Sequence, residues 1–273
     1  MKNNQHLYLD TQKTLLIHTL HFPSLANLFH LNNETQFLAG PCSVESLEQM
    51  EVIARFLQSK GMRFIRAGAY KPRTSPYSFQ GLGEEGLQII KHVSSKYSLF
   101  SISEIMDARD IELFLKHIDI LQVGSRNMQN TTLLKEIGKT NHPVLLKRGM
   151  MSTLKEFLLA AEYIVAGGNK NLILCERGIR TFEESTRNTL DISTIAIIKN
   201  ETSLPVIVDL SHSLGRKDIL LPVSKAVQAL NVDGIMLEVH NEPAKALSDA
   251  RYQLSLEEFA ALLCAFQDSE RTH

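Results

Sequence analysis

Six basic residues occupy similar places in this sequence. Each stands at the end of a short apolar run or in the segment that follows it. They are Arg66, Lys71, Arg73, Arg126, Lys147 and Arg177. Burying unpaired charges is costly, so such a set needs negative partners. A structural ring of ion pairs would supply them from acidic residues at neighbouring run ends, but the surplus here is cationic. Because arginine and lysine bind phosphate and carboxylate groups well, the pattern favours a pocket for phosphorylated anions.

A second set combines one thiol, one imidazole and two carboxylates at other run ends. Its members are Cys42, His212, Glu238 and Asp249. Taken singly, a cysteine is most often a small buried side chain, a histidine can hydrogen-bond a loop, and Asp249 can cap a helix. Taken together, these mixed donors suit a divalent transition metal with open coordination positions. Cys175 and Cys264 lack such neighbours, and we expect both to be packing residues.

The elements that must position these side chains alternate along the chain. Short apolar runs, interpreted as strands, cover residues 36–40, 63–67, 99–103, 118–123, 143–147, 171–175, 205–209 and 234–239. Between them, apolar residues three and four apart indicate amphipathic helices, for example at residues 47–59, 154–166 and 224–230. About eight such units predict an α/β fold, the (β/α)8 TIM barrel, with a doubly wound open sheet as the alternative. In a barrel the carboxyl ends of the strands meet on one face, where both sets of residues would converge.

The barrel is expected over residues 35–273, preceded by a short N-terminal extension at residues 1–34. The extension holds His6, His18, His21 and His30 without the spacing of metal ligands. We therefore expect it to cover the bottom of the barrel or to contribute to a subunit contact. The polar tail at residues 268–273 is expected to fray.

The composition of the whole chain excludes several classes of protein. It has 29 basic and 30 acidic residues, a net charge of -1, which gives no support for a nucleic-acid binder. Its hydrophobic content of 44% argues against disorder. Three cysteines do not suggest a disulfide framework, so a cytoplasmic location is expected. No stretch approaches the roughly 18 apolar residues of a membrane span, and the polar start lacks the core of a signal peptide.

The chain resembles the 3-deoxy-D-arabino-heptulosonate 7-phosphate (DAHP) synthases, in the subgroup related to 3-deoxy-octulosonate 8-phosphate synthase. The matching blocks are AGPCSVES at 39–46, RAGAYKPRTSPYSFQG at 66–81, EIMD at 104–107, LQVGSRN at 121–127, VLLKRG at 144–149, ILCERGIRT at 173–181, DLSHSLGR at 209–216 and GIMLEVH at 234–240. The second block is the most specific. Octulosonate enzymes typically carry Asn-Arg where this chain has Lys71-Pro72-Arg73-Thr74, and this difference favours a four-carbon sugar phosphate over arabinose 5-phosphate.

The resemblance implies a condensation of phosphoenolpyruvate with erythrose 4-phosphate, which opens the shikimate route to the aromatic amino acids. It also implies a homo-oligomer, a dimer or a tetramer. By position, the family's ligands for a divalent metal ion of the Mn, Fe, Zn or Co type match Cys42, His212, Glu238 and Asp249.

The resemblance also assigns roles toward the substrates. The family's phosphoenolpyruvate contacts match Arg66, Lys71, Arg126, Lys147 and Arg177, and its aldose phosphate contacts match Arg73 and Thr74. Glu104 matches an acidic residue near the reacting carbon, where it would order water. The catalytic candidates are therefore Lys71, Cys42, Glu104 and His212.

Two departures from the family pattern have consequences. Leu210 stands where the family often has proline, which loosens one backbone angle beside His212. Relatives often carry a regulatory domain, and residues 1–34 are too short for one, so we expect little feedback inhibition by aromatic amino acids. Three alternatives stay open: an octulosonate 8-phosphate synthase using arabinose 5-phosphate, a non-catalytic barrel that senses phosphoenolpyruvate, and an unrelated phosphate-binding barrel.

Overall fold

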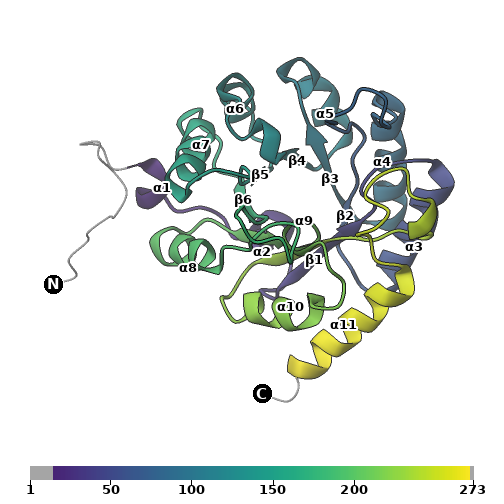
Figure 1. The fold of residues 1–273 in the computed structure, drawn as a ribbon. Helices are drawn as coiled ribbons and strands as arrows, with labels where there is room; N and C mark the ends of the chain where they lie inside the picture. The colour runs from purple at the N-terminus through teal and green to yellow at the C-terminus, as the bar shows by residue number, and fades with distance from the viewer. Residues whose placement is uncertain (1–14, 271–273) are drawn as a thin grey trace.

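A closed barrel of eight parallel strands forms the centre of the protein (Figure 1). The computed structural model describes residues 15–270. The strands are β1 (Gln36–Gly40), β2 (Phe64–Arg66), β3 (Phe100–Ile105), β4 (Ile120–Val123), β5 (Val144–Lys147), β6 (Leu172–Glu176), β7 (Val206–Asp209) and β8 (Gly234–Glu238). They follow one another around the ring, and β1 pairs with β8 from Gln36↔Gly234 to Gly40↔Glu238. The predicted (β/α)8 TIM barrel is confirmed, and the open sheet is excluded.

Helices surround this ring on its outside (Figure 1). They are α3 (Leu47–Ser59), α4 (Glu84–Tyr97), α5 (Ile111–His117), α6 (Thr131–Gly138), α7 (Leu154–Ala166), α8 (Ile192–Glu201), α10 (Leu220–Gln228) and α11 (Leu256–Glu270), with a short α9 (Leu210–Leu214) directly after β7. Single 3₁₀ turns are η1 (Ala108–Asp110), η2 (Ser125–Asn127) and η3 (Pro243–Lys245). Within residues 15–270, no helix is both long and apolar enough to cross a bilayer.

Local sequence accounts for most of the helix boundaries. Ser46 caps α3 by accepting a hydrogen bond from the Gln49 amide, and Thr153 and Glu156 form a reciprocal capping box at the start of α7. The predicted helix at 224–230 begins too late, because α10 starts at Leu220. Pro222 lies in its first turn, where the missing amide hydrogen would have had no partner within the helix.

Alternating side chains of the strands divide the core into two layers. In β6, Leu172 and Leu174 pack outward against the helices, whereas Ile173 and Cys175 point into the barrel interior. Cys175 is therefore a packing residue, as predicted. Cys264 is not, because it lies on the exposed side of α11.

The described part of the extension forms α1 (Leu16–Thr19) and α2 (Leu25–Phe29). Helix α2 closes the amino-terminal end of the barrel, where the Phe29 ring lies 5.2 Å from that of Phe64 and 4.7 Å from that of Phe100. Figure 1 shows α2 at the centre of the strand ring. This placement agrees with the expected cover for the bottom of the barrel. His6 lies outside the described residues, and no histidine described in the extension belongs to a metal-ligand group.

Candidate active site

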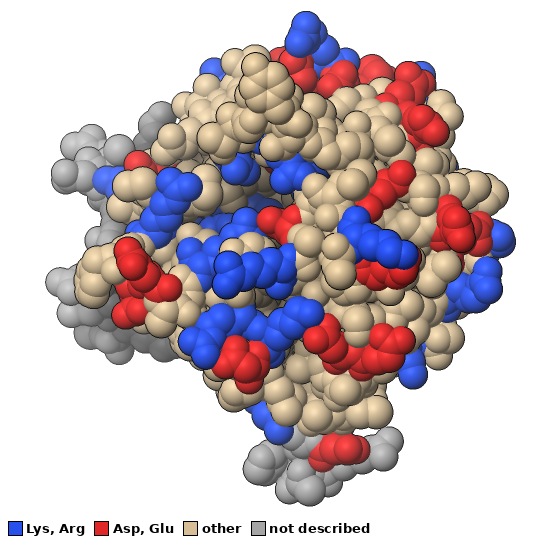
Figure 2. Space-filling model, turned by 45° about the vertical axis from the view of Figure 1, so that its right-hand side comes forward, with Lys and Arg blue, Asp and Glu red and all other residues tan. Residues whose placement is uncertain are grey.

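A polar cavity of about 440 Å³ opens at the carboxyl end of the strands. Figure 2 shows Lys and Arg side chains gathered around a hollow on the face it displays. Of the residues singled out from the sequence, the cavity wall includes Lys71, Arg73, Thr74, Glu104, Arg126, Lys147, Arg177, His212 and Asp249. The closure of the barrel therefore brings together residues that are up to 178 positions apart in the chain, from Lys71 to Asp249 (249 − 71).

Asp209 organises the wall beside β7. Its carboxylate pairs with Lys147 Nζ, caps α9 by accepting from the His212 amide, and lies 2.8 Å from His212 Nδ1. Burial alone would raise the pKa of Asp209, but His212 and Lys147 hold that pKa well below its usual range. Burial lowers the pKa of His212. Because the Asp209 carboxylate accepts a hydrogen bond from Nδ1–H, the neutral ring presents the lone pair of Nε2 to the site.

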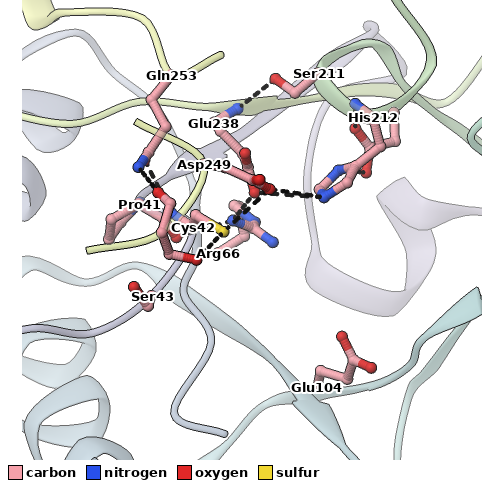
Figure 3. Close-up of polar contacts among 12 residues, drawn as sticks. Pro41, Cys42, Ser43, Arg66, Glu104, Ser211, His212, Glu238, Asp249 and Gln253 are labelled. Atoms are coloured by element: carbon pink, nitrogen blue, oxygen red, sulfur yellow. Dashed lines mark hydrogen bonds and ion pairs between the residues drawn. The ribbon is translucent and has the colours of Figure 1, made fainter. Parts of the chain in front are cut away.

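The thiol and the two carboxylates predicted as metal ligands form a compact group. One ligand atom from each of Cys42, Glu238 and Asp249 lies within 4.8 Å of the other two (Figure 3). His212 Nε2 joins them at 3.6 Å from Glu238 Oε1 and 3.8 Å from Asp249 Oδ2. Asp249 lies in the loop between β8 and α11, seven residues before α11 begins, so it does not cap that helix. The four side chains thus come from the adjacent ends of β7, β8 and β1.

This donor set fits a divalent cation. Glu238 Oε2 is buried without a hydrogen-bond partner among the described residues, although the adjacent oxygen Oε1 accepts from Arg66. Burial, and after it the charge of Glu238, raises the pKa of the Cys42 thiol to about 11. A bound cation would give the unpartnered oxygen a positive neighbour and would favour the thiolate. Leu210 is fully buried in the first turn of α9 and does not keep His212 from this group.

Arg66 lies beneath the cavity rather than on its wall. Arg66 is 4% exposed, and its Nη1 donates to Glu238 Oε1 at 3.0 Å and to the Pro41 carbonyl at 2.9 Å. Gly40 permits this arrangement, because a Cβ at that position would lie 2.2 Å from the Arg66 carbonyl oxygen. Arg66 therefore supports Glu238 directly and adds positive charge below the cavity.

Glu104 stands apart from the metal-ligand group, on the opposite side of the site in Figure 3. It extends from β3, and its Oε2 accepts a hydrogen bond from Gln122 at 3.4 Å. Gly124 leaves room for it, since a Cβ there would lie 2.0 Å from Glu104 Oε1. The carboxylate therefore reaches the cavity beside the backbone that leads to Arg126.

The loop after β2 carries the motif that best matched the family. Lys71 is almost buried, and its Nζ donates to the Cys42 carbonyl at 2.9 Å. Arg73 donates from Nε to the Phe79 carbonyl at 3.0 Å and from Nη2 to Ser248 Oγ at 2.5 Å. Thr74 is exposed at the edge of the cavity.

Sequence reasoning missed two further arginines on the wall, Arg180 and Arg187. Both lie in the long loop between β6 and α8, where no apolar run precedes them and charged neighbours suggest a solvated segment. Arg187 Nη1 lies 3.4 Å from Asp249 Oδ2, and its guanidinium stacks 4.7 Å from the Tyr252 ring centre. Asp209 was also missed as a site residue, although an aspartate at a strand end three residues before a histidine could have indicated it.

The fold and the cavity together define a TIM-barrel protein with a basic cavity at the carboxyl ends of the strands, where the active sites of TIM-barrel enzymes lie. Residues 29–273 match the sequence profile of the DAHP synthetase I family, and the chain belongs to this family.

Individual relatives agree with this assignment. Phospho-2-dehydro-3-deoxyheptonate aldolase of Thermotoga maritima is 52% identical over 232 residues, which cover 85% of this chain and 69% of the relative. The 2-dehydro-3-deoxyphosphooctonate aldolase of Geobacter sulfurreducens is 30% identical over 244 residues, covering 83% and 89%. The crystal structure of the T. maritima DAHP synthase superposes with a TM-score of 0.85 at 49% identity, covering 88% of this chain and 71% of that one. A truncated form of the T. maritima enzyme gives 0.81 at 45% identity, covering 88% of each chain.

Proposed function

We propose that this protein condenses phosphoenolpyruvate with erythrose 4-phosphate to give 3-deoxy-D-arabino-heptulosonate 7-phosphate and inorganic phosphate. The observation that carries the proposal is the pairing of two features in one cavity. Seven basic side chains among the described residues line it. The group of one thiol and two carboxylates lies at its edge, with the His212 imidazole beside the two carboxylates. Two anionic substrates that repel each other need such a cationic wall in order to lie side by side.

Phosphoenolpyruvate carries a carboxylate and a phosphate, so fixing its plane requires positive charge at both ends. Arg126, Lys147 and Arg177 line the cavity on neighbouring strand ends and would hold these groups, together with Lys71, whose Nζ donates to the Cys42 carbonyl. Arg66 lies beneath the cavity, where it pairs with Glu238 and adds positive charge. Holding two reactants in a reactive orientation can lower a barrier by roughly 7–11 kcal/mol in favourable cases.

The aldose phosphate would be held at its phosphate end by Arg73 and Thr74, with its aldehyde toward Cys42, His212, Glu238 and Asp249. A divalent metal ion held by these four side chains would supply Lewis-acid polarisation of the aldehyde carbonyl. C3 of phosphoenolpyruvate then bonds to the aldehyde carbon, whose oxygen takes up a proton. Lys71 Nζ lies beside Cys42 and can supply this proton.

Glu104 would serve the second half of the reaction. Attack by C3 leaves positive character at C2 of phosphoenolpyruvate. Glu104 reaches the cavity away from the metal-ligand group and can orient a water molecule toward that carbon. The water oxygen bonds to C2 as Glu104 takes one of its protons. The bond from C2 to the phosphate oxygen then breaks, and the remaining hydroxyl proton passes to the departing phosphate, which leaves the C2 carbonyl of the product.

A second candidate function is that of an octulosonate 8-phosphate synthase, which would take arabinose 5-phosphate in the same site. The similarity to the Geobacter 2-dehydro-3-deoxyphosphooctonate aldolase supports this candidate. A phosphate-release assay with phosphoenolpyruvate and each aldose in turn distinguishes the two. We expect release with erythrose 4-phosphate, and its loss after chelation. Preference for arabinose 5-phosphate would contradict the proposal, and binding of phosphoenolpyruvate without turnover of either aldose would indicate a sensor.

We further infer the organisation in which this chemistry operates. Residues 35–273 would form the catalytic barrel, and residues 1–34 the extension. The three cysteines are all unpaired, which is consistent with a cytoplasmic enzyme. A dimer or tetramer is expected, and light scattering after size-exclusion chromatography would measure the mass of the assembly.

A further inference from the structure

Ser248 links two parts of the site that the proposed function treats separately. Its side chain is buried, and Oγ lies 3.1 Å from Cys42 Sγ, one of the metal-ligand candidates. The same oxygen receives a hydrogen bond from Arg73 Nη2, in the loop that would bind the aldose phosphate. One hydroxyl thus joins Cys42 and Arg73, which lie on different loops.

The direction of these hydrogen bonds follows from their chemistry. A guanidinium group can only donate, so Ser248 Oγ accepts from Arg73. The single proton of Ser248 is then left for the sulfur of Cys42, which accepts it. This order also suits a deprotonated sulfur, because a thiolate can accept a hydrogen bond but cannot donate one.

The anchor beneath Ser248 is rigid. The Gln253 side chain is fully buried and holds both ends of the link, since Nε2 donates to the Ser248 carbonyl at 2.8 Å and Oε1 accepts from the Cys42 amide at 3.0 Å. The adjacent Leu247 amide donates to Glu45 Oε1 at 2.9 Å, which ties the same segment to the loop after β1. Ser248 and Cys42 are therefore parts of one hydrogen-bonded unit.

The Arg73 side chain contacts this unit and is held at two of its nitrogen atoms. Nε is held by the Phe79 carbonyl of its own loop, and Nη2 is held by Ser248. Nη1 is left without a protein partner among the described residues and lies in a side chain that lines the cavity. Because a guanidinium is planar, fixing two of its nitrogens also fixes the direction of the third.

We propose that Ser248 is a positioning residue that sets the separation between Arg73 and Cys42 and thereby selects the aldose phosphate by its length. The inference rests on the proposed function, in which Arg73 binds the phosphate and the aldehyde lies near Cys42. Each additional carbon in the sugar moves its phosphate farther from its aldehyde. An arginine held by Ser248 cannot follow that movement, whereas a released arginine can.

The test compares Ser248→Ala, which removes the hydroxyl, with Ser248→Thr, which retains it, all at saturating metal. For Ser248→Ala we expect the KM for erythrose 4-phosphate to rise about 10-fold, the loss typical of one hydrogen bond to a charged group. The KM for phosphoenolpyruvate should stay within about twofold. The preference for erythrose 4-phosphate over arabinose 5-phosphate, as a ratio of kcat/KM values, should fall by about the same 10-fold, and Ser248→Thr should restore it.

Further experiments distinguish an effect on aldose binding from an effect on turnover or on folding. The Kd of erythrose 4-phosphate, titrated calorimetrically without phosphoenolpyruvate, should weaken with the KM. Arg73→Lys cannot form the two-point attachment, so adding Ser248→Ala to it should produce no further change in preference. Ser94→Ala, at a buried serine of α4 whose hydroxyl donates to the Lys91 carbonyl, serves as the matched control.

Three outcomes would overturn the inference. They are an unchanged aldose preference in Ser248→Ala, an equal rise in both KM values, and an additive effect in the double variant. A wild-type protein that condenses neither aldose would instead refute the proposed function, which distinguishes the two failures.

Discussion

At the residue scale, the backbone of Cys42 is held by hydrogen bonds while its sulfur faces the proposed metal-ligand group. Its carbonyl accepts a hydrogen bond from Lys71 Nζ, and its amide donates to Gln253 Oε1, so the backbone is held from both sides. The sulfur then faces Ser248 and Asp249 at 3.1 and 3.5 Å. A side chain fixed in this way is prepared to bind an ion without a change in the fold.

Cys42→Ala should abolish metal-dependent activity while the barrel stays folded, because the substitution removes one proposed metal ligand and leaves the backbone contacts intact. Circular dichroism and metal analysis after dialysis would check both parts. Cys264→Ala, on the exposed side of α11, should retain metal and activity. A Cys42→Ala protein with full activity would refute the ligand assignment.

Arg126→Ala should raise the KM for phosphoenolpyruvate roughly 10- to 100-fold, as expected for loss of a charged hydrogen bond to an anion. The effect on the KM for erythrose 4-phosphate should be smaller. Steady-state kinetics with each substrate varied would measure the difference. The matched control is Arg109→Ala, an exposed arginine of η1 that pairs with Asp107 outside the cavity wall. Unchanged kinetics in Arg126→Ala would exclude a role for Arg126.

At the scale of elements, the short helix α2 has a clear structural task. The two ends of a barrel differ, since the carboxyl ends of the strands carry the active site and the amino ends need to be closed against water. Phe29 of α2 closes that end by packing on Phe64 and Phe100, the first residues of β2 and β3. Catalysis and closure are thus separated by the length of the barrel.

Phe29→Ala should therefore lower the free energy of unfolding by about 3–5 kcal/mol, the usual cost of removing a buried phenylalanine ring. Guanidinium denaturation would measure it. The KM values should stay within about twofold, because the ring lies at the end of the barrel away from the site. Phe182→Ala is the control, since that ring is 97% exposed, and an equal loss in both variants would contradict the assigned packing.

At the scale of the whole molecule, charge is distributed unevenly. The chain has a net charge of -1, yet the cavity wall combines Lys71, Arg73, Arg126, Lys147, Arg177, Arg180 and Arg187 with few acidic residues. Such a concave basic site attracts anions and concentrates them. Two acidic residues also line it, Glu104 and Asp249, and the proposed reaction gives them separate tasks.

Removal of the metal should therefore abolish activity without disrupting the basic cavity wall that would bind the substrates. We expect activity to fall at least 100-fold on chelation and to return with added divalent ions. Phosphoenolpyruvate should still raise the melting temperature of the chelated protein, because the basic wall does not depend on the ion. The control is the chelator saturated beforehand with the same divalent ion that restores activity, and full activity in the free chelator would contradict a metal requirement.

The alternation of apolar runs and amphipathic helices was enough to predict the barrel, because strand and helix periodicities are local properties of the chain. The residue types at run ends likewise predicted that thiol, imidazole, carboxylates and basic groups would meet. The start of α10 was misplaced, since the effect of a proline depends on its position within the first turn.

Only the tertiary structure decided which charges face the cavity and which support them. Barrel closure joins Cys42 to Gln253 across 211 positions, and it places Arg66 beneath the site while Arg180 and Arg187 reach the wall. The pairing of Asp209 with Lys147 and the link from Arg73 to Ser248 have the same origin. Contacts of this range depend on how all eight strands pack together, and no periodicity within a short segment encodes them.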